Sequence, residues 1–259
     1  MNSAVSTESD VVRRLRSAGC VFAEDEARLL VAAASGEAEL EALVSRRAAG
    51  VPLEHLLGWA EFGGRRVVVE SGVFVPRRRT EFLAEVACSL ARRGSVVVDL
   101  CCGAGAVASV VVGAVPGVRV WAADVDPVAV RCARRTLAGT GAVVCEGDFD
   151  VALPSTLLGR VDVLVANVPY VPSGAVGLMP AEARLHESRV ALDGGVDGLD
   201  VVRRLMGVAP RWVVSGGWVL FEVGVGQVES AVAVVEAAGL VPGVRSCGER
   251  DATVVLGRV

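Results

Sequence analysis

Two different patterns of apolar residues divide the chain. Across residues 7–49, apolar positions recur at helical spacing in three segments: STESDVVRRLRSAGC, AEDEARLLVAAASG and EAELEALVSRRAAG. The first segment starts with polar residues typical of a helix cap, and the second ends on a glycine. From residue 95 onward, short valine-rich runs alternate with segments of helix length. The pattern predicts a small helical N-terminal part followed by an α/β part.

The valine-rich runs predict a parallel sheet. They are SVVVDL, VRVWAADVD, AVVCEGD, VDVLVANVPY and GGWVLFEVG. Their apolar residues are continuous rather than alternating, which indicates strands buried on both faces between layers of helices. The tail LVPGVRSCGERDATVVLGRV contains two strand-like runs joined by a turn with no helix between them. We therefore expect a doubly wound, Rossmann-like sheet with an antiparallel C-terminal strand.

A glycine-rich hairpin signal connects the two parts. The segment WAEFGGRRVVVESGVFVP contains two short apolar runs around a Gly-Gly pair. We place the domain boundary within residues 70–80. This predicts a helical domain with its hairpin linker over residues 1–75 and a catalytic domain over residues 76–259.

Composition and charge narrow the possible functions. Of 259 residues, 53% are hydrophobic and 22% are charged, which is sufficient for a large core. The formal net charge of −4 provides no overall attraction to nucleic acid. Five arginines (65, 66, 77, 78 and 79) form a local basic cluster with one acid, Glu70, which is open to two interpretations. It is either an ordinary solvated surface or a polyanion site.

Neither the spacing of the cysteines nor the N-terminal sequence indicates a secreted or a metal-binding protein. The seven cysteines form no C-x-x-C pair, so we expect neither a disulfide framework nor a metal site. The N-terminus has no signal-peptide pattern, and the longest apolar run, around 106–115, is too short to cross a bilayer. We expect a cytoplasmic protein without membrane contact. The two histidines, His55 and His186, lie outside the strand ends and are interpreted as surface or linker residues.

In a doubly wound sheet, ligands bind just beyond the carboxyl ends of the strands. The first run ends in DLCCGAGAV, with the spacing D-x-C-x-G-x-G. Such a turn lets a ligand approach the N-terminus of the following helix. Its candidate cofactor-binding residues are Asp99, Cys101, Cys102, Gly103, Ala104 and Gly105. Taken alone, this turn is explained equally well by a tight connection with no ligand.

The next two strand ends carry acids suited to an adenosine. Asp124 lies 20 to 25 residues beyond the glycine-rich turn, where a carboxylate can accept both ribose hydroxyls. Asp126 precedes Pro127 and is better explained as a helix cap. Asp148 can accept from an adenine amino group, and Phe149 can cover the base. These elements do not separate NAD from S-adenosylmethionine.

The fourth strand ends in Asn167-Val168-Pro169-Tyr170, which includes the chain's one tyrosine. A residue before proline is held extended, so the Asn167 side-chain oxygen and the Val168 carbonyl can bind both hydrogens of one NH2 group. The lone pair of an amide or aniline-like nitrogen is delocalised and poorly nucleophilic. Fixing both hydrogens orients that nitrogen for attack on a sulfonium methyl group. Tyr170 would form a flat wall beside the planar group.

These motifs together resemble a known family. NVPY, DLCCGAGA and AADVDPVAVRCARRTL are similar to class I S-adenosylmethionine-dependent methyltransferases with an N-P-P-Y motif. The resemblance extends to HemK/PrmC-type protein-glutamine N-methyltransferases, which modify peptide-chain release factors. The further matches are Pro52, Leu53, Gly58, Glu61 to Gly64, Pro76, Arg77, Thr80 and Glu81, and then the segment LMPAEARLHESRVALDGGVDGLDVVRRL. The resemblance covers roughly residue 40 to the C-terminus.

The resemblance implies roles for the motif residues. The Cys101–Gly105 loop would hold the methionine part of S-adenosylmethionine, Asp124 its ribose, and Asp148 with Phe149 its adenine. Asn167 and the Val168 carbonyl would hold the acceptor amide, with Pro169 and Tyr170 shaping its slot. Asn167 is also expected among the cofactor-binding residues. The resemblance also implies a protein substrate docked by the N-terminal helices and only indirect contact with nucleic acid. We expect a monomer.

The chain departs from the family pattern at several positions. Val168 replaces the first proline of the motif, Cys101 replaces the first loop glycine, and P-R-P-E-T-E becomes PRRRTE over residues 76–81. The family's Glu-Pro pair is Glu187-Ser188 here. Two other functions therefore stay open. One is methylation of adenine or guanine amino groups in nucleic acid, and the other is a binding protein that retains the fold without the chemistry.

Overall fold

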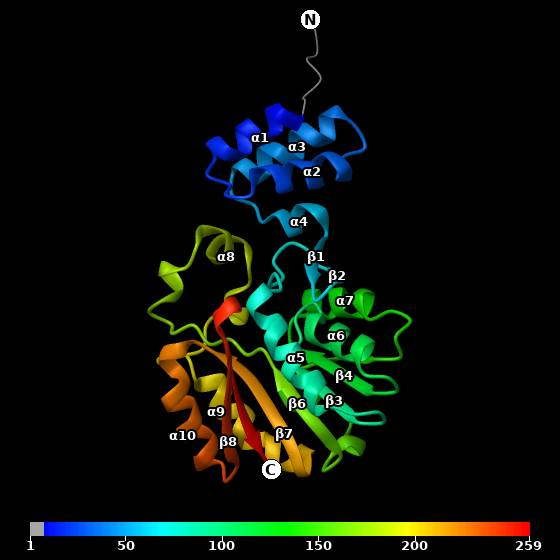
Figure 1. Cartoon of the computed structure of the whole chain (residues 1–259), viewed down its shortest axis with the longest axis vertical. Helices are drawn as coiled ribbons and strands as arrows, with labels where there is room; N and C mark the ends of the chain where they lie inside the picture. Colours follow the sequence, from blue (N-terminus) through cyan, green and yellow to red (C-terminus); the bar gives the residue numbers. More distant parts are fainter. Residues whose placement is uncertain (1–7) are drawn as a thin grey trace, which may run out of the picture.

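The computed structural model describes residues 8–259. Three helices at the N-terminus lie apart from a large α/β body, and a short helix with a two-stranded hairpin connects them (Figure 1). These elements are α1 (Glu8–Ser17), α2 (Ala23–Ala33), α3 (Glu37–Ala48), α4 (Leu53–Leu57), β1 (Trp59–Phe62) and β2 (Arg65–Val68). The helices and the hairpin form where the apolar spacing predicts them. The capping residues predicted before α1 lie outside the described residues.

The first three helices share a core of their own. Val11, Leu15, Leu30 and Val44 are almost completely buried among them. The Arg47 guanidinium donates to Glu26 on α2 (Nε–Oε2 2.6 Å) and to Glu182 on α8 (Ala181–His186). A buried charge is stable only when it is paired. Arg47 therefore connects the helical part to the segment that follows the NVPY corner.

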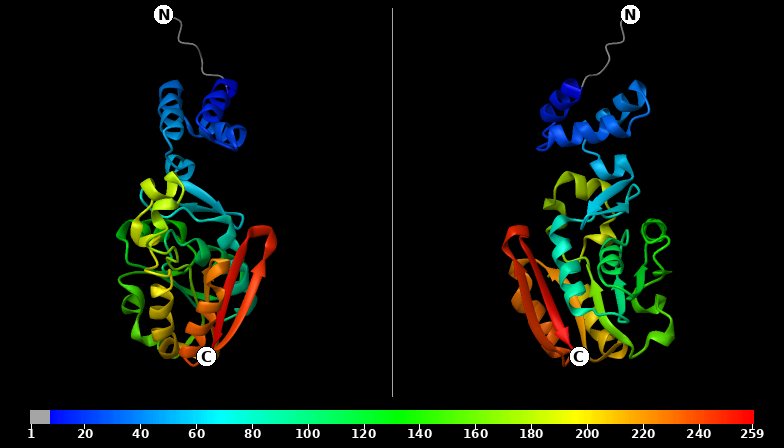
Figure 2. Two further views of the ribbon diagram at one scale, coloured as in Figure 1. Left: turned by 90° about the vertical axis from the view of Figure 1, so that its left-hand side faces the viewer. Right: turned by 45° about the vertical axis from the view of Figure 1, so that its right-hand side comes forward.

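The α/β body contains a seven-stranded sheet with helices on both faces (Figure 2). Its strands are β3 (Val96–Leu100), β4 (Arg119–Asp124), β5 (Val143–Glu146), β6 (Val161–Ala166), β7 (Val213–Val223), β8 (Val241–Cys247) and β9 (Ala252–Arg258). Their spatial order is β5-β4-β3-β6-β7-β9-β8. The first five in sequence pair in parallel, and β9 is antiparallel to both β7 and β8. The predicted doubly wound fold with an antiparallel C-terminal strand is confirmed.

Two aliphatic cores form because successive residues of a strand face opposite sides of the sheet. The core that contains Val97 and Val165 packs against α5 (Glu81–Leu90), α6 (Ala106–Ala114) and α7 (Pro127–Thr136). The core that contains Val98 and Leu164 packs against α9 (Asp200–Trp212) and α10 (Val228–Ala237). Every residue of β3 is buried, as the continuous valine run predicts.

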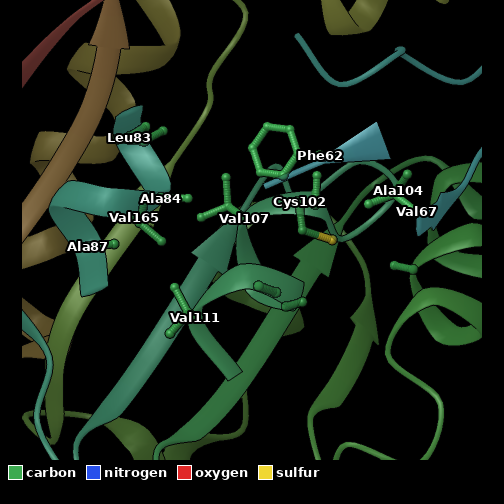
Figure 3. Close-up of a cluster of buried hydrophobic side chains, with 14 of the residues drawn as sticks. Phe62, Val67, Leu83, Ala84, Ala87, Cys102, Ala104, Val107, Val111 and Val165 are labelled. Carbon is green, nitrogen blue, oxygen red and sulfur yellow. The ribbon is translucent and has the colours of Figure 1, made fainter. Parts of the chain in front are cut away.

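The hairpin packs on the α/β body close to the first strand end. Figure 3 shows Phe62 of β1 beside Val107 of α6 and Cys102 of the preceding turn. Phe62 is fully buried in this core. The Val68 N–H donates to the Thr136 hydroxyl at the end of α7 (2.9 Å). The linker is therefore part of the wall around the carboxyl ends of the strands.

Candidate active site

A cavity of about 610 Å³ opens at the carboxyl ends of the parallel strands. The order of strands reverses between β3 and β6, which is where ligands bind in doubly wound sheets. Turns after β3, β4, β5 and β6 form one side of the cavity. Residues between 62 and 80, which begin in the linker hairpin, and residues 179–192 form the other side. The volume lies in the range of small-molecule sites.

The turn after β3 contributes most of the predicted cofactor residues. Cys101, Cys102, Gly103 and Ala104 line the cavity. Cys101 has a positive φ of 56°, a conformation that favours glycine. This explains why the family usually has glycine at this position. Gly105 does not line the cavity. A Cβ there would lie 3.3 Å from the Leu137 side chain of the C-terminal end of α7, so this glycine serves the packing of α6 against α7.

Asp99, at the end of β3, is the most deeply buried acid of the site. It is 1% exposed, and its Oδ2 atom accepts from the Ala108 N–H (3.0 Å). Burial raises its pKa to about 7, the backbone hydrogen bond opposes this, and the nearby Asp124 charge adds to it. Asp99 touches the cavity but mainly holds the first turn of α6.

Asp124, at the end of β4, organises the turn that faces the cavity. Its two oxygens accept from the backbone N–H groups of Gly103 (2.8 Å) and Asp126 (2.9 Å). Burial raises its pKa, and these hydrogen bonds oppose that shift. Asp126 accepts from the Val128 N–H (2.8 Å) as the cap of α7, as predicted. Asp124 also lines the cavity, where its remaining acceptor capacity is available to a ligand.

The end of β5 has a feature that the sequence did not indicate. Asp148 is paired with Arg204 of α9 (2.8 Å), which lowers the pKa of the carboxyl group. The Arg204 guanidinium lies over the Phe149 ring, 4.6 Å from its centroid, and lines the same cavity. The predicted adenine pair therefore has a third member. Arg204 follows Asp148 by more than fifty residues, so no local motif revealed it.

The corner after β6 places an unpaired acceptor at the cavity wall. Asn167, Val168, Pro169 and Tyr170 all line the cavity. Among residues 8–259, the buried Asn167 Oδ1 atom has no hydrogen-bond partner, and no backbone N–H donates to the Val168 carbonyl. Buried acceptors are normally satisfied, so an unpaired one needs an explanation. The Oδ1 atom is shielded from solvent in this structure, so contact with a ligand requires a half-turn of the Asn167 amide about its last torsion, which exchanges its oxygen and nitrogen ends.

A glycine-rich loop clamps this corner from outside. The Val171 N–H donates to the Leu192 carbonyl (3.1 Å), and Gln227 Nε2 donates to the Tyr170 carbonyl (2.9 Å). Gly198 has a φ of 79°, and a Cβ there would lie 2.3 Å from the Tyr170 carbonyl oxygen. Only glycine fits so close to the corner. The loop belongs to the segment DGGVDG, whose structural role sequence reasoning did not identify.

The basic cluster does not form a single patch. Arg66 lies over Trp59 (4.1 Å to the ring centroid), and Arg78 is exposed. Arg77 and Arg79 instead line the cavity, paired with the buried Glu187 and Glu222. A sequence pattern cannot separate these roles, because the partners lie more than a hundred residues away.

Neither histidine is among the residues that line the cavity. His55 was expected on the surface or in the linker; it lies in the linker but is buried, with Nε2 2.8 Å from the Val73 carbonyl oxygen. His186 is partly exposed at the end of α8. Within residues 8–259, no three His, Cys, Asp or Glu side chains gather as metal ligands. No helix in this part of the chain is both long and apolar enough to cross a membrane.

A doubly wound sheet with this set of strand ends around one cavity is typical of enzymes that bind a nucleoside-containing cofactor. The family model described as "Methyltransferase small domain" matches residues 65–217, which is more than half of the chain. The chain belongs to this family and, within it, to the branch that contains the release factor glutamine methyltransferases. It is therefore an S-adenosylmethionine-dependent enzyme.

Two curated relatives illustrate this branch. A release factor glutamine methyltransferase of Geobacter sulfurreducens is 36% identical over 199 residues, covering 76% of this chain and 69% of the relative. A Streptomyces pristinaespiralis enzyme is 38% identical over 203 residues, with the same two coverages of 76% and 69%. It is named 4-amino-L-phenylalanine/4-methylamino-L-phenylalanine methyltransferase. The branch therefore includes enzymes named for two chemically different acceptors.

A solved structure supports the fold. The methyltransferase from Pyrococcus furiosus superimposes with a TM-score of 0.57 at 14% identity, covering 76% of this chain and 89% of that one. At this identity the likeness concerns the fold alone.

Proposed function

We propose that this enzyme methylates the side-chain amide nitrogen of a glutamine in a peptide-chain release factor. The observation that carries the proposal is that Asn167 and Val168 both line the cavity, while the Asn167 Oδ1 atom and the Val168 carbonyl have no hydrogen-bond partner among residues 8–259. Two acceptors from consecutive residues match the two hydrogens of one NH2 group. The name of the Geobacter sulfurreducens relative supports a glutamine acceptor.

The residues present fit S-adenosylmethionine. Gly103 lines the cavity, and a Cβ added there would meet no atom within 4 Å, so the turn leaves room for a ligand against the backbone. We assign the methionine part to residues 101–104, the ribose to Asp124, and the adenine to Asp148 with Phe149. When bound, the cofactor supplies an electrophilic methyl group on a positively charged sulfur.

The protein's own contribution is to hold the acceptor nitrogen. Asn167 Oδ1 and the Val168 carbonyl would accept one hydrogen each, which fixes the plane of the NH2 group and directs its face into the cavity. Positioning of this kind can supply several kcal/mol of a barrier. Tyr170 donates its hydroxyl to Glu222 (2.8 Å), so its ring is held in place as one wall of the slot. No general base is assigned, because methyl transfer leaves a positive charge on the amide nitrogen, and this cationic nitrogen readily releases one proton to water.

We propose that the N-terminal helices and the segment around α8 dock the protein substrate. Leu178, Leu185 and Val190 are apolar side chains exposed along residues 175–192, next to the cavity that Val190 itself lines. The ion pair between Arg47 and Glu182 ties this segment to the helical part. An apolar rim beside a catalytic cavity is suited to binding a protein loop. We also propose the division into residues 1–75 and 76–259, because helices α1 to α3 bury a core of their own. We further propose that the enzyme is a monomer.

The test is to incubate the enzyme with a release factor and methyl-labelled cofactor, and then to digest separate samples with protease and nuclease. We expect one methyl group on a single glutamine by tandem mass spectrometry, with the label released by protease. Label released by nuclease would replace this proposal with methylation of a base amino group. A folded enzyme that does not bind the cofactor in calorimetry would indicate a binding protein without the chemistry.

A second acceptor class is favoured by the Streptomyces pristinaespiralis relative, whose name specifies an aromatic amine on an amino acid. The nitrogen of an aniline is also planar and also carries two hydrogens, so the same pair of acceptors would hold it. Steady-state rates with the release factor and with 4-aminophenylalanine, measured side by side, decide between the two. The acceptor with the higher kcat/KM is the physiological class.

A further inference from the structure

The side of the cavity that faces the linker is lined by two arginines. Arg79 lies in the short 3-10 turn Arg78–Thr80, and its guanidinium carbon lies 5.8 Å from the Tyr170 ring centroid. Arg77 lies over Phe74, 4.9 Å from its ring centroid. Both side chains line the cavity and are partly exposed, at 38% for Arg77 and 29% for Arg79.

Their counter-charges lie behind the wall. Arg79 Nε is 2.9 Å from Glu222 Oε1, and Arg77 pairs with Glu187. Both glutamate side chains are 1% exposed, and neither lines the cavity. The carboxylates that do line the cavity, Asp99, Asp124, Asp126 and Asp148, belong to the ends of β3, β4 and β5. On the side of the strand ends the one lining guanidinium, that of Arg204, is paired with Asp148, whereas the counter-charges of Arg77 and Arg79 lie outside the lining.

One oxygen of Glu222 accepts a hydrogen bond from the Tyr170 phenol and forms an ion pair, without a hydrogen bond, with Arg79 Nε. The Tyr170 hydroxyl donates to Glu222 Oε1 at 2.8 Å, the same atom that faces Arg79 Nε. Among residues 8–259, the two terminal nitrogens of Arg79 form no hydrogen bond, and the guanidinium lies near the face of the Tyr170 ring. Guanidinium donors lie in a rigid fork that matches a carboxylate. Glu222 thus orients the Arg79 guanidinium from the side away from the cavity, and the terminal nitrogens of Arg79 are left to donate to a ligand.

We propose that Arg79 binds a carboxylate carried by the methyl acceptor, close to the nitrogen that is methylated. This rests on the proposed function, because it places the reacting NH2 group at Asn167 and Val168. The family pattern described above has glutamate where this chain has Arg79, so the charge at this position is reversed. The carboxylate belongs either to a free amino acid or to an acidic side chain beside a glutamine in a protein.

The reaction is the same for both sources. The acceptor nitrogen forms a bond to the methyl carbon while the carbon–sulfur bond breaks, and that electron pair stays on sulfur. The nitrogen then releases one proton to water. Arg79 takes no part in these bond changes, so its contribution is to acceptor binding.

The experiment compares two matched acceptor pairs with the full-length enzyme. The small pair is 4-aminophenylalanine and 4-aminophenethylamine, which differ by the carboxylate. The peptides of the second pair each carry one glutamine, followed by glutamate in one peptide and by the uncharged methionine in the other. For at least one pair, we expect the carboxylate member to have a KM at least tenfold lower at similar kcat. The pair that shows the preference identifies the source of the carboxylate.

Variants assign the preference to Arg79. Arg79→Gln should reduce the KM ratio to within about twofold, and Arg79→Lys should retain part of it because the charge remains. Arg78→Gln is the matched control, since Arg78 is exposed, adjacent and outside the cavity lining. Equal KM values within both pairs for the wild type, or a full preference in Arg79→Gln, would overturn the proposal.

Calorimetry separates this inference from the proposed function. The same acceptors are titrated into the enzyme saturated with S-adenosylhomocysteine, so no turnover is needed. Tighter binding of the carboxylate member without any methyl transfer would keep the carboxylate site and reject the proposed reaction. Equal affinities within both pairs reject the carboxylate site whether or not methyl transfer occurs. If Arg79→Gln does not fold, the wild-type pairs alone decide.

Discussion

Replacement of Asn167 by alanine separates the chemistry of the site from its stability. The change removes the unpaired Oδ1 atom and leaves the Val168 carbonyl in place. Loss of one preorganised polar contact to a reacting group costs about 2–4 kcal/mol of transition-state stabilisation, or about 30- to 900-fold in kcat. Cofactor affinity should change little, because the cofactor's assigned contacts lie mainly on the ends of β3, β4 and β5.

The same substitution should not destabilise the protein in proportion. A buried acceptor without a partner carries a desolvation penalty of about 1–3 kcal/mol, and alanine removes it while losing little packing. We therefore expect the free energy of unfolding to change by no more than about 1 kcal/mol. Val168→Ala is the converse control. The Val168 side chain is 1% exposed, so the loss of two carbons should lower the free energy of unfolding by about 2 kcal/mol. The main-chain carbonyl of residue 168 remains in this variant.

The assay measures kcat from S-adenosylhomocysteine release, cofactor Kd by calorimetry and unfolding in urea for both variants. The predicted crossover is a large loss of kcat with near-normal stability for Asn167→Ala, and a loss of stability with a much smaller loss of kcat for Val168→Ala. An Asn167→Ala enzyme with unchanged turnover, or with cofactor affinity reduced as much as kcat, would refute the reasoning.

Four further predictions follow from the site. Asp124→Ala should weaken cofactor binding about tenfold or more in calorimetry, since hydrogen bonds to a charged group contribute about 1.5–3 kcal/mol. Gly198→Ala should lower the free energy of unfolding in urea by more than about 1 kcal/mol, because φ is 79° and a Cβ would lie 2.3 Å from the Tyr170 carbonyl oxygen. Burial raises the pKa of Asp99 to about 7, from about 3.9 when unfolded, so the folded protein binds more protons between these values. The contribution of Asp99 to stability is therefore complete below about pH 4 and lost as the pH rises to 7, and Asp99→Asn should flatten this part of the curve in urea titrations. Val168→Pro should retain activity in the S-adenosylhomocysteine assay, because the carbonyl survives.

The strands and the local turns could be predicted because their signals are local. A continuous run such as VVVDL indicates a buried parallel strand, and β3 is buried throughout. The residues that follow each strand meet at one edge of the sheet for a topological reason, so Cys101, Asp124, Phe149 and Asn167 could be placed around one cavity before any coordinates.

The contacts between distant segments could not be predicted. Arg204 lies on α9 and meets Asp148 and Phe149 only because that helix packs across the sheet. The sequence places Arg77 and Arg79 in one local basic cluster. In the structure, each forms an ion pair with a buried glutamate from a remote segment. Gly105 was expected among the cofactor contacts because of the motif spacing, but it faces α7. Spacing along the chain does not specify which side of a turn a residue faces.

The most direct test of the central claim is a crystal structure of the enzyme with S-adenosylhomocysteine and a glutamine-bearing acceptor. The account predicts that one acceptor nitrogen lies within hydrogen-bond distance, about 3 Å, of both Asn167 Oδ1 and the Val168 carbonyl oxygen. An acceptor nitrogen bound elsewhere in the cavity, with those two oxygens turned away from it, would contradict the account.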